Sequence, residues 1–219
     1  MTRGTFDYIA ICDPICAQQI GHNFQAIKAY SDHLRQYTPN IQAFTSLSLP
    51  YNTELKQLPP WITPHYSHYY SRLIPIRRVS PRDVAAASIA RSDSTNAHQE
   101  ATNEAIKSLS KILELAHQSK RPALFFPSVD YYSLAALAEI CDKKVAKGVL
   151  FFIRFIGVLE TTSYQNAGDP ALTSLLKTLK DSPISSSLFF AAECESLAKR
   201  LEDDLGRNAT ITPTLHEAE

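Results

Sequence analysis

The stretch Lys147-Gly-Val-Leu-Phe-Phe-Ile-Arg-Phe155 is apolar at almost every position and is interrupted by a single arginine, Arg154. A strand that is apolar at successive positions is typical of a parallel sheet, because helices cover both faces of such a sheet. Residues 147–155 are therefore predicted to form a buried strand. The apolar run 149–159 is too short to cross a membrane, which takes roughly 20 residues.

Similar short strands alternate with helical patterns along the rest of the chain. The other predicted strands are 6–12, 41–47, 73–77, 123–126, 187–191 and 208–212. Apolar residues three or four positions apart predict helices over 22–37, 134–141, 169–179 and 194–205, and Gly206 is expected to end the last one. Alternating strands and helices predict right-handed βαβ units. The predicted fold is α/β: a Rossmann-like, doubly wound, mainly parallel sheet of about seven strands with helices on both faces.

The length and composition are those of a globular protein with one large domain or two small ones. The chain has 219 residues, and 22 Lys and Arg balance 22 Asp and Glu, which argues against binding nucleic acid through bulk charge. The four cysteines include no CxxC pair, so we expect reduced thiols in a cytoplasmic protein. The Cys-x3-Cys spacing of Cys12 and Cys16 lacks a second ligand pair, and the histidines form no HxxxH or HExxH motif. Neither a metal nor a cofactor is expected.

Residues 48–100 interrupt the alternation with prolines and aromatic residues. We therefore interpret 1–219 as a single domain that carries an irregular insertion at 48–100. Within it, residues 61–82 contain four arginines and no acidic residue. One interpretation is peripheral contact with anionic lipid at the inner face of a membrane. The other is a solvated loop whose aromatic side chains pack on the domain.

Polar residues follow the first predicted strand, where an open parallel sheet binds its ligands. They are Asp13 and, at the start of the next helix, Gly21, His22 and Asn23. Gly21 would let a ligand approach the backbone, and the N–H groups of a helix start favour a phosphate. The alternative is an ordinary helix start capped by Asn23. Neither the G-x-G-x-x-G nor the P-loop pattern occurs, so fingerprints for NAD and ATP are absent.

Later strands also end in polar residues. Asp130 either caps the following helix or accepts a hydrogen bond from a sugar hydroxyl. Tyr131 and Tyr132 beside it could stack on a sugar ring, although one of the two is expected in the core. Arg154 lies in a buried strand, so it either forms a salt bridge with a carboxylate at a strand end or faces a cleft, where it would contact an anion. Glu193 follows the 187–191 strand.

Four stretches together resemble the N-terminal domain of GT-B glycosyltransferases, and are most similar to the family 4 group of retaining enzymes. The stretches are the first strand leading to Gly21-His22, then residues 125–130, 150–155 and 188–198, the last of which runs into a strand at 209–213.

This resemblance implies a hexosyltransferase in which the N-terminal domain binds the acceptor and a C-terminal domain binds the nucleotide-sugar donor. The acceptor would be a sugar or a lipid-linked sugar in the synthesis of a surface polysaccharide or glycolipid. Catalysis would depend on charge stabilisation and positioning, without a metal. The residues implied are His22 and Asp130 as catalytic, Gly21 and Asn23 as donor-phosphate-binding, and Arg154, Tyr131 and Glu193 as acceptor-binding.

The chain ends at Glu219, where the linker to the donor domain begins in the family. The family's E-x7-E motif lies in that second domain, and Glu195 and Glu202 have a different spacing. We therefore expect the donor-binding domain to lie outside this chain, on a longer protein or on a separate partner. The competing hypothesis is a non-catalytic Rossmann-like binding or scaffold domain that engages a protein through 48–100. Sugar transfer by the complete form would favour the first, and partner binding without sugar recognition the second.

Overall fold

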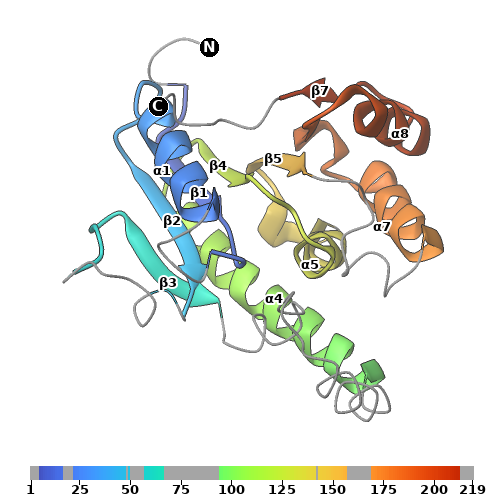
Figure 1. The fold of residues 1–219 in the computed structure, drawn as a ribbon, viewed down its shortest axis with the longest axis horizontal. Helices are drawn as coiled ribbons and strands as arrows, with labels where there is room; N and C mark the ends of the chain where they lie inside the picture. The colour runs from blue at the N-terminus through green and yellow to red at the C-terminus, as the bar shows by residue number, and fades with distance from the viewer. Residues whose placement is uncertain are drawn as a thin grey trace.

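The protein folds around one parallel sheet (Figure 1). The structure, a computed structural model, describes residues 5–16, 22–47, 49, 57–66, 94–141, 143–156 and 169–212. The sheet has seven strands in the order β3-β2-β1-β4-β5-β6-β7, and every neighbouring pair is parallel. The strands are β1 (Tyr8–Cys12), β2 (Ile41–Ser46), β3 (Ile62–Tyr66), β4 (Pro122–Phe126), β5 (Leu150–Phe155), β6 (Leu188–Ala192) and β7 (Thr210–Ile211).

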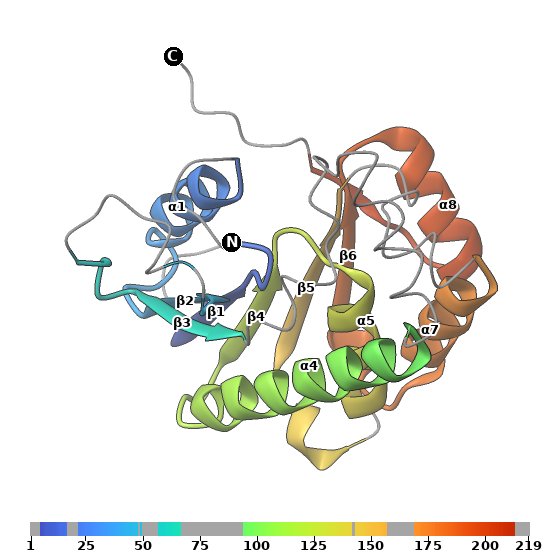
Figure 2. The same cartoon turned by 60° about the horizontal axis from the view of Figure 1, so that its bottom comes forward.

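Helices lie on both faces of the sheet (Figure 2). They are α1 (His22–Leu34), α4 (Ser94–Ala116), α5 (Tyr131–Cys141), α7 (Asp169–Asp181) and α8 (Glu195–Leu205), with short 3-10 turns η3 (Lys144–Ala146) and η4 (Ser185–Ser187). Helix α1 covers one face, and α4, α5, α7 and α8 cover the other. Strand order runs one way from β1 to β3 and the other way from β4 to β7, so right-handed crossovers place the helices on opposite faces. The predicted doubly wound α/β fold is confirmed.

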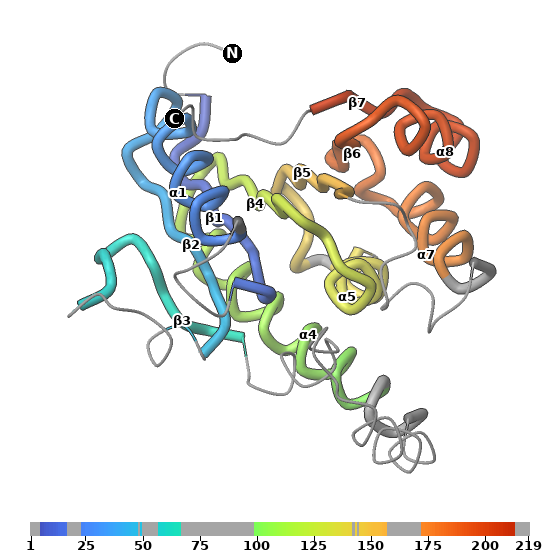
Figure 3. Tube along the Cα trace, in the orientation of Figure 1, coloured from blue at the N-terminus to red at the C-terminus, as the bar shows by residue number. Residues whose placement is uncertain are grey.

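Two hydrophobic clusters form the core, one on each face of the sheet. The larger joins the sheet to α4, α5, α7 and α8, and the smaller lies between the sheet and α1. Figure 3 shows α5, α7 and α8 side by side along the β4–β6 half of the sheet. Helix α5 is buried along most of its length because α4 and α7 pack on either side of it.

Two elements differ from the sequence prediction. The third strand lies at another place in the chain, and the longest described helix was not predicted. The third strand is β3 at 62–66, inside the segment interpreted as an irregular insertion, whereas the predicted strand 73–77 lies outside the described residues. Pro64 interrupts the strand pattern in the sequence, but β3 is an edge strand, where a proline costs no ladder hydrogen bond. Helix α4 was not predicted, because alanines form the first part of its buried stripe.

The end of α8 follows the prediction. Gly206 adopts a φ of 66°, and its N–H donates to the Glu202 carbonyl. A glycine in this left-handed conformation is the usual residue just beyond a helix.

Candidate functional site

The sheet has a topological switch point between β1 and β4. The chain leaves β1 for α1 on one face and leaves β4 for α5 on the other, and ligands of open α/β sheets bind at such a point. Four side chains interact there, at the carboxyl edge of the sheet: Cys12, Asp13, Tyr66 and Asp130. We call them the switch-point site.

Asp13 directly follows β1 and is 1% exposed. Its backbone N–H donates to the Phe44 carbonyl at 3.0 Å, which continues the pairing with β2. Its Oδ1 accepts hydrogen bonds from the N–H groups of Ile15 at 3.0 Å and Cys16 at 3.1 Å. Within the described part of the chain, Oδ2 receives no hydrogen bond, so one oxygen of a fixed carboxyl remains for a ligand.

Burial raises the pKa of Asp13 to about 7, and the charge of Asp130 contributes to the rise. The N–H groups of Cys16 and Ile15 act in the opposite direction, because they stabilise the carboxylate. A carboxyl with a pKa near 7 can accept or release a proton at neutral pH.

Asp130 caps helix α5. Its Oδ1 accepts hydrogen bonds from the N–H groups of Tyr132 at 2.8 Å and Ser133 at 3.1 Å, and its Oδ2 accepts one from the Ser133 hydroxyl at 2.7 Å. These bonds confirm the interpretation of Asp130 as a helix cap. The same residue is buried beside Asp13, so the catalytic role that the resemblance implied stays a prediction.

Tyr66 and Cys12 complete the switch-point site. Their hydroxyl and thiol are hydrogen-bonded, and both side chains are almost fully buried. Burial raises the pKa of Cys12 to about 12 and raises the pKa of Tyr66 well above its usual value. Both groups are therefore neutral at physiological pH.

Sequence reasoning did not single out Tyr66, since it lies in the segment interpreted as an insertion. Asp13 was named from its position directly after the first strand, but the sequence assigned it no role.

The predicted phosphate-binding residues stand at the start of α1. Helix α1 begins at His22, as expected, and Asn23 is its second residue and half-buried. Gly21 and the side chain of His22 lie outside the described residues. The phosphate-binding role of Gly21 and Asn23 and the catalytic role of His22 stay predictions.

Arg154 is 3% exposed and its guanidinium donates to backbone carbonyls. Its Nη1 donates to the Pro127 carbonyl at 3.1 Å, and its Nε and Nη2 donate to the Thr212 carbonyl at 3.2 and 3.1 Å. Nε also contacts the Thr212 hydroxyl. The guanidinium thus joins the loop after β4 to the chain after β7, an arrangement that the two sequence interpretations, a salt bridge or an anion contact, had not included.

An apolar cavity of about 330 Å³ lies beside Arg154. We call it the aromatic cavity, and its lining is Tyr30, Phe125, Phe152, Ile153, Arg154, Phe189, Phe190, Ala191, Thr210 and Thr212. The rings of Phe152 and Phe189 are stacked, with centroids 5.1 Å apart and planes 18° apart. Phe189 is 46% exposed, so an apolar ring stays open to a ligand.

The other two predicted acceptor residues do not line the aromatic cavity. Tyr131, the first residue of α5, is half-buried and makes an edge-to-face contact with Tyr132. Glu193 follows β6, and its backbone N–H donates to the Phe155 carbonyl at 3.2 Å. Both follow strands at the carboxyl edge of the sheet, outside the described residues that line the aromatic cavity.

The described residues contain neither a metal-binding cluster nor a membrane-spanning helix. No group of three or more His, Cys, Asp or Glu side chains in them is placed to hold a metal ion. None of the helices in the described ranges is long and apolar enough to cross a bilayer. Most of the basic segment 61–82 falls outside these ranges.

Comparisons with protein-family models, curated proteins and solved structures give no match to this chain. The resemblance to GT-B glycosyltransferases therefore stays a prediction from the four sequence stretches.

Proposed function

We propose that this chain is the acceptor-binding N-terminal domain of a GT-B glycosyltransferase. The observation that carries the proposal is the buried pair Asp13 and Asp130 at the switch point, with the pKa of Asp13 raised to about 7. A carboxyl of this kind can accept a hydrogen bond from an acceptor hydroxyl at neutral pH. The doubly wound sheet supports the same proposal, because it is the fold that the resemblance implies.

In the proposed reaction, the acceptor oxygen bonds to the anomeric carbon of the donor sugar. The bond from that carbon to the diphosphate oxygen breaks, and the proton of the acceptor hydroxyl passes to the leaving diphosphate oxygen. Asp13 would orient that hydroxyl through Oδ2, and burial, with a smaller contribution from the charge of Asp130, would keep the pKa of Asp13 high. The nucleotide sugar would be held by a donor domain outside this chain.

The aromatic cavity supports a lipid-linked acceptor rather than a free sugar. Its walls are mostly rings and aliphatic groups, and burial of apolar ligand surface contributes roughly 25 cal/mol per Å². A sugar that carries an apolar tail would place the tail against Phe152 and Phe189. Peripheral contact with a membrane is consistent with such a substrate and stays part of this proposal.

A non-catalytic scaffold domain is the second candidate. Phe189 on β6 and Ile211 on β7 are 46% and 51% exposed, and exposed apolar residues on neighbouring strands are typical of a protein-binding surface. A protein partner that binds there and is lost in both Phe189→Ser and Ile211→Ser would favour this candidate.

Calorimetry with a simple glycolipid tests the proposed function on this chain. Octyl β-D-glucopyranoside, kept below its micelle concentration, is compared with glucose and with octanol. We expect octyl glucoside to bind at least tenfold more tightly than either fragment, because only it presents both a hydroxyl-rich ring and an apolar tail. Equal binding of octanol and octyl glucoside would show that no sugar is recognised and would overturn the proposal.

A further inference from the structure

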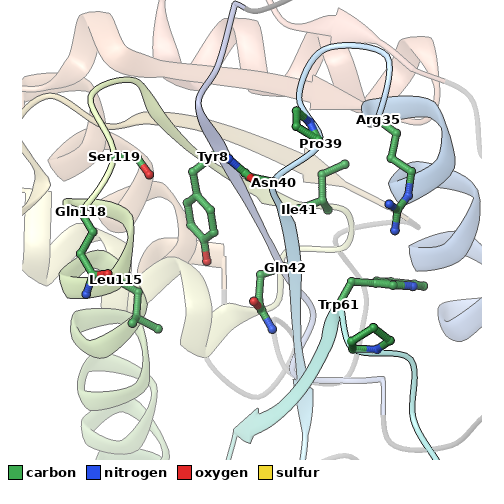
Figure 4. Close-up of a pocket in the computed structure, with 11 residues that line it drawn as sticks. Tyr8, Arg35, Pro39, Asn40, Ile41, Gln42, Trp61, Leu115, Gln118 and Ser119 are labelled. Atoms are coloured by element: carbon green, nitrogen blue, oxygen red, sulfur yellow. The ribbon is translucent and has the colours of Figure 1, made fainter.

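A second groove lies at the amino ends of the strands, whereas the switch-point site lies at their carboxyl ends. Figure 4 shows the residues that line this groove. Its volume is about 660 Å³. We call it the basal groove, and its lining is Tyr8, Arg35, Pro39, Asn40, Ile41, Gln42, Pro60, Trp61, Leu115, Gln118 and Ser119. Tyr8 and Ile41 begin β1 and β2, and Trp61 immediately precedes β3. The groove therefore lies at the amino ends of these strands, away from Asp13 and Asp130.

The lining combines aromatic rings with uncharged hydrogen-bonding groups. Tyr8 and Trp61 supply the rings, and three amides and a hydroxyl supply donors and acceptors, from Asn40, Gln42, Gln118 and Ser119. Among the described residues, no carboxyl group is part of the lining, and Arg35 is its one charged residue. The guanidinium carbon of Arg35 is 5.9 Å from the ring centroid of Trp61, a cation–π contact. Such a lining favours an uncharged ligand.

Two of the amides are oriented by the protein. The Nε2 of Gln42 donates to the Thr63 hydroxyl, which leaves the amide oxygen as an acceptor for a ligand. The Nδ2 of Asn40 donates to the Asp7 carbonyl at 2.9 Å. These contacts fix polar groups in the groove before a ligand arrives, which reduces the entropy cost of binding.

Tyr8 adds a donor beside Gln42. Burial raises the pKa of Tyr8, so its hydroxyl stays protonated at physiological pH. In Figure 4 Gln42 lies between Tyr8 and Trp61, and the hydroxyl end of Tyr8 is directed toward Gln42. A ligand hydroxyl placed here could both donate to the Gln42 oxygen and accept from Tyr8.

The end of α4 forms one wall. Leu115 is 45% exposed, and in Figure 4 it lies to one side of Tyr8 together with Gln118 and Ser119, whereas Gln42 lies to the other. An aromatic ring and an aliphatic side chain in one groove suit a flat ring with apolar faces, and the amides around them suit hydroxyl groups on its rim. A pyranose ring has both properties.

We propose that the basal groove binds a neutral saccharide, with one sugar ring between Tyr8 and Leu115 and its hydroxyl groups bonded to Gln42 and Gln118. The proposed acceptor does not occupy the basal groove. The groove is independent of the switch-point site, because the two lie at opposite ends of the strands.

Trp61 provides a direct measurement, since it is the single tryptophan of the chain. Its fluorescence is recorded while maltose, cellobiose, lactose and N,N′-diacetylchitobiose are added, with uridine and adenosine as competing ligand classes. We expect at least one disaccharide to give a saturable change with a Kd of about 1 mM or below. A response to a nucleoside and to none of the disaccharides would overturn the proposal, as would no response at all.

Two matched variants locate the binding site. Gln118→Leu removes an amide of the groove, and Gln99→Leu makes the same change on α4 far from it, where Gln99 is exposed and contacts Asn103. Gln118→Leu should weaken the disaccharide at least fivefold, and Gln99→Leu should stay within twofold of the original protein. Equal affinities in both variants would contradict the proposed site. Asp13→Asn should leave this binding unchanged, which separates the inference from the proposed function.

Discussion

Asp13 and Asp130 stand at the carboxyl ends of neighbouring strands, β1 and β4, and the charge of Asp130 helps to raise the pKa of Asp13. Each carboxyl accepts hydrogen bonds from two backbone N–H groups, but the two carboxyls have different roles. Asp130 uses both oxygens to cap α5, whereas Asp13 holds its loop through Oδ1. The site thus pairs an anchored carboxylate with a carboxyl that titrates near neutrality.

The raised pKa of Asp13 predicts a pH-dependent stability. In the unfolded chain this carboxyl loses its proton around pH 3.8, and in the folded protein around pH 7. Asp13 therefore contributes fully to the free energy of unfolding below pH 3.8, and this contribution is lost as the pH rises through about 7. The full loss amounts to roughly 4 kcal/mol at most.

Asp13→Asn should remove this dependence, because the amide does not titrate. The melting temperature of Asp13→Asn minus that of the original protein should be larger at pH 8 than at pH 5. Asp203→Asn, an exposed change on α8, is the control and should show no such trend. A constant difference for Asp13→Asn at both pH values would refute the raised pKa.

Removal of the α5 cap should destabilise the fold. Asp130→Ala deletes the acceptor of the Tyr132 and Ser133 N–H groups and should cost about 1–2 kcal/mol in the free energy of unfolding. The cost should be smaller at pH 8 than at pH 5, because the variant also relieves the repulsion of charged Asp13. Urea unfolding at the two pH values measures both effects, and an equal cost at each pH would argue against the coupling.

Arg154 should prove essential to stability. Arg154→Ala leaves the carbonyls of Pro127 and Thr212 without their donor and should cost about 3 kcal/mol. Arg154→Lys restores the charge but not the planar fork, so it should recover only part of the loss. Arg200→Ala on α8, where the side chain is 40% exposed, should cost less than about 1 kcal/mol in the same urea titration. Similar costs for Arg154→Ala and Arg200→Ala would mean that the buried bonds of Arg154 contribute little.

The aromatic cavity should bind an apolar dye. N-phenyl-1-naphthylamine, an uncharged dye that fluoresces in apolar surroundings, should bind the folded protein and be displaced by octyl β-D-glucopyranoside. Phe189→Ser should weaken the dye at least fivefold, because it removes the exposed ring of the stack. Ile211→Ser is the matched control, since Ile211 is equally exposed but lies outside the cavity lining. Similar losses in both variants would show that the dye binds the exposed surface and not the cavity.

Most of the fold could be predicted from the sequence. A continuously apolar strand such as 150–155 indicates that both faces of the sheet are covered. Regular leucine spacing predicts helices α7 and α8. The edge strand β3 could not be predicted, because an exposed edge tolerates Pro64 and needs no alternating pattern. Helix α4 was missed because Ala101 and Ala105, which let it pack closely, carry little hydrophobic signal.

The candidate site was predicted only in outline. The rule that ligands bind at the carboxyl edge led to Asp130, but capping and catalysis give the same sequence pattern. The proximity of Tyr66 to Asp13 depends on β3 lying two strands away from β1, which no local pattern reveals. The bonds of Arg154 join segments 27 and 58 residues away in the chain, so its burial could be predicted but its partners could not.

Sugar transfer by the protein expressed from its natural gene decides whether the switch-point site belongs to a glycosyltransferase. Release of nucleoside diphosphate is measured with UDP-glucose, UDP-N-acetylglucosamine and GDP-mannose as donors and octyl β-D-glucopyranoside as acceptor. The account predicts release that depends on both donor and acceptor, falls at least tenfold in Asp13→Asn and is unchanged in Asp203→Asn. Acceptor-dependent release that is the same in Asp13→Asn as in the original protein, or no release with any donor, would contradict it.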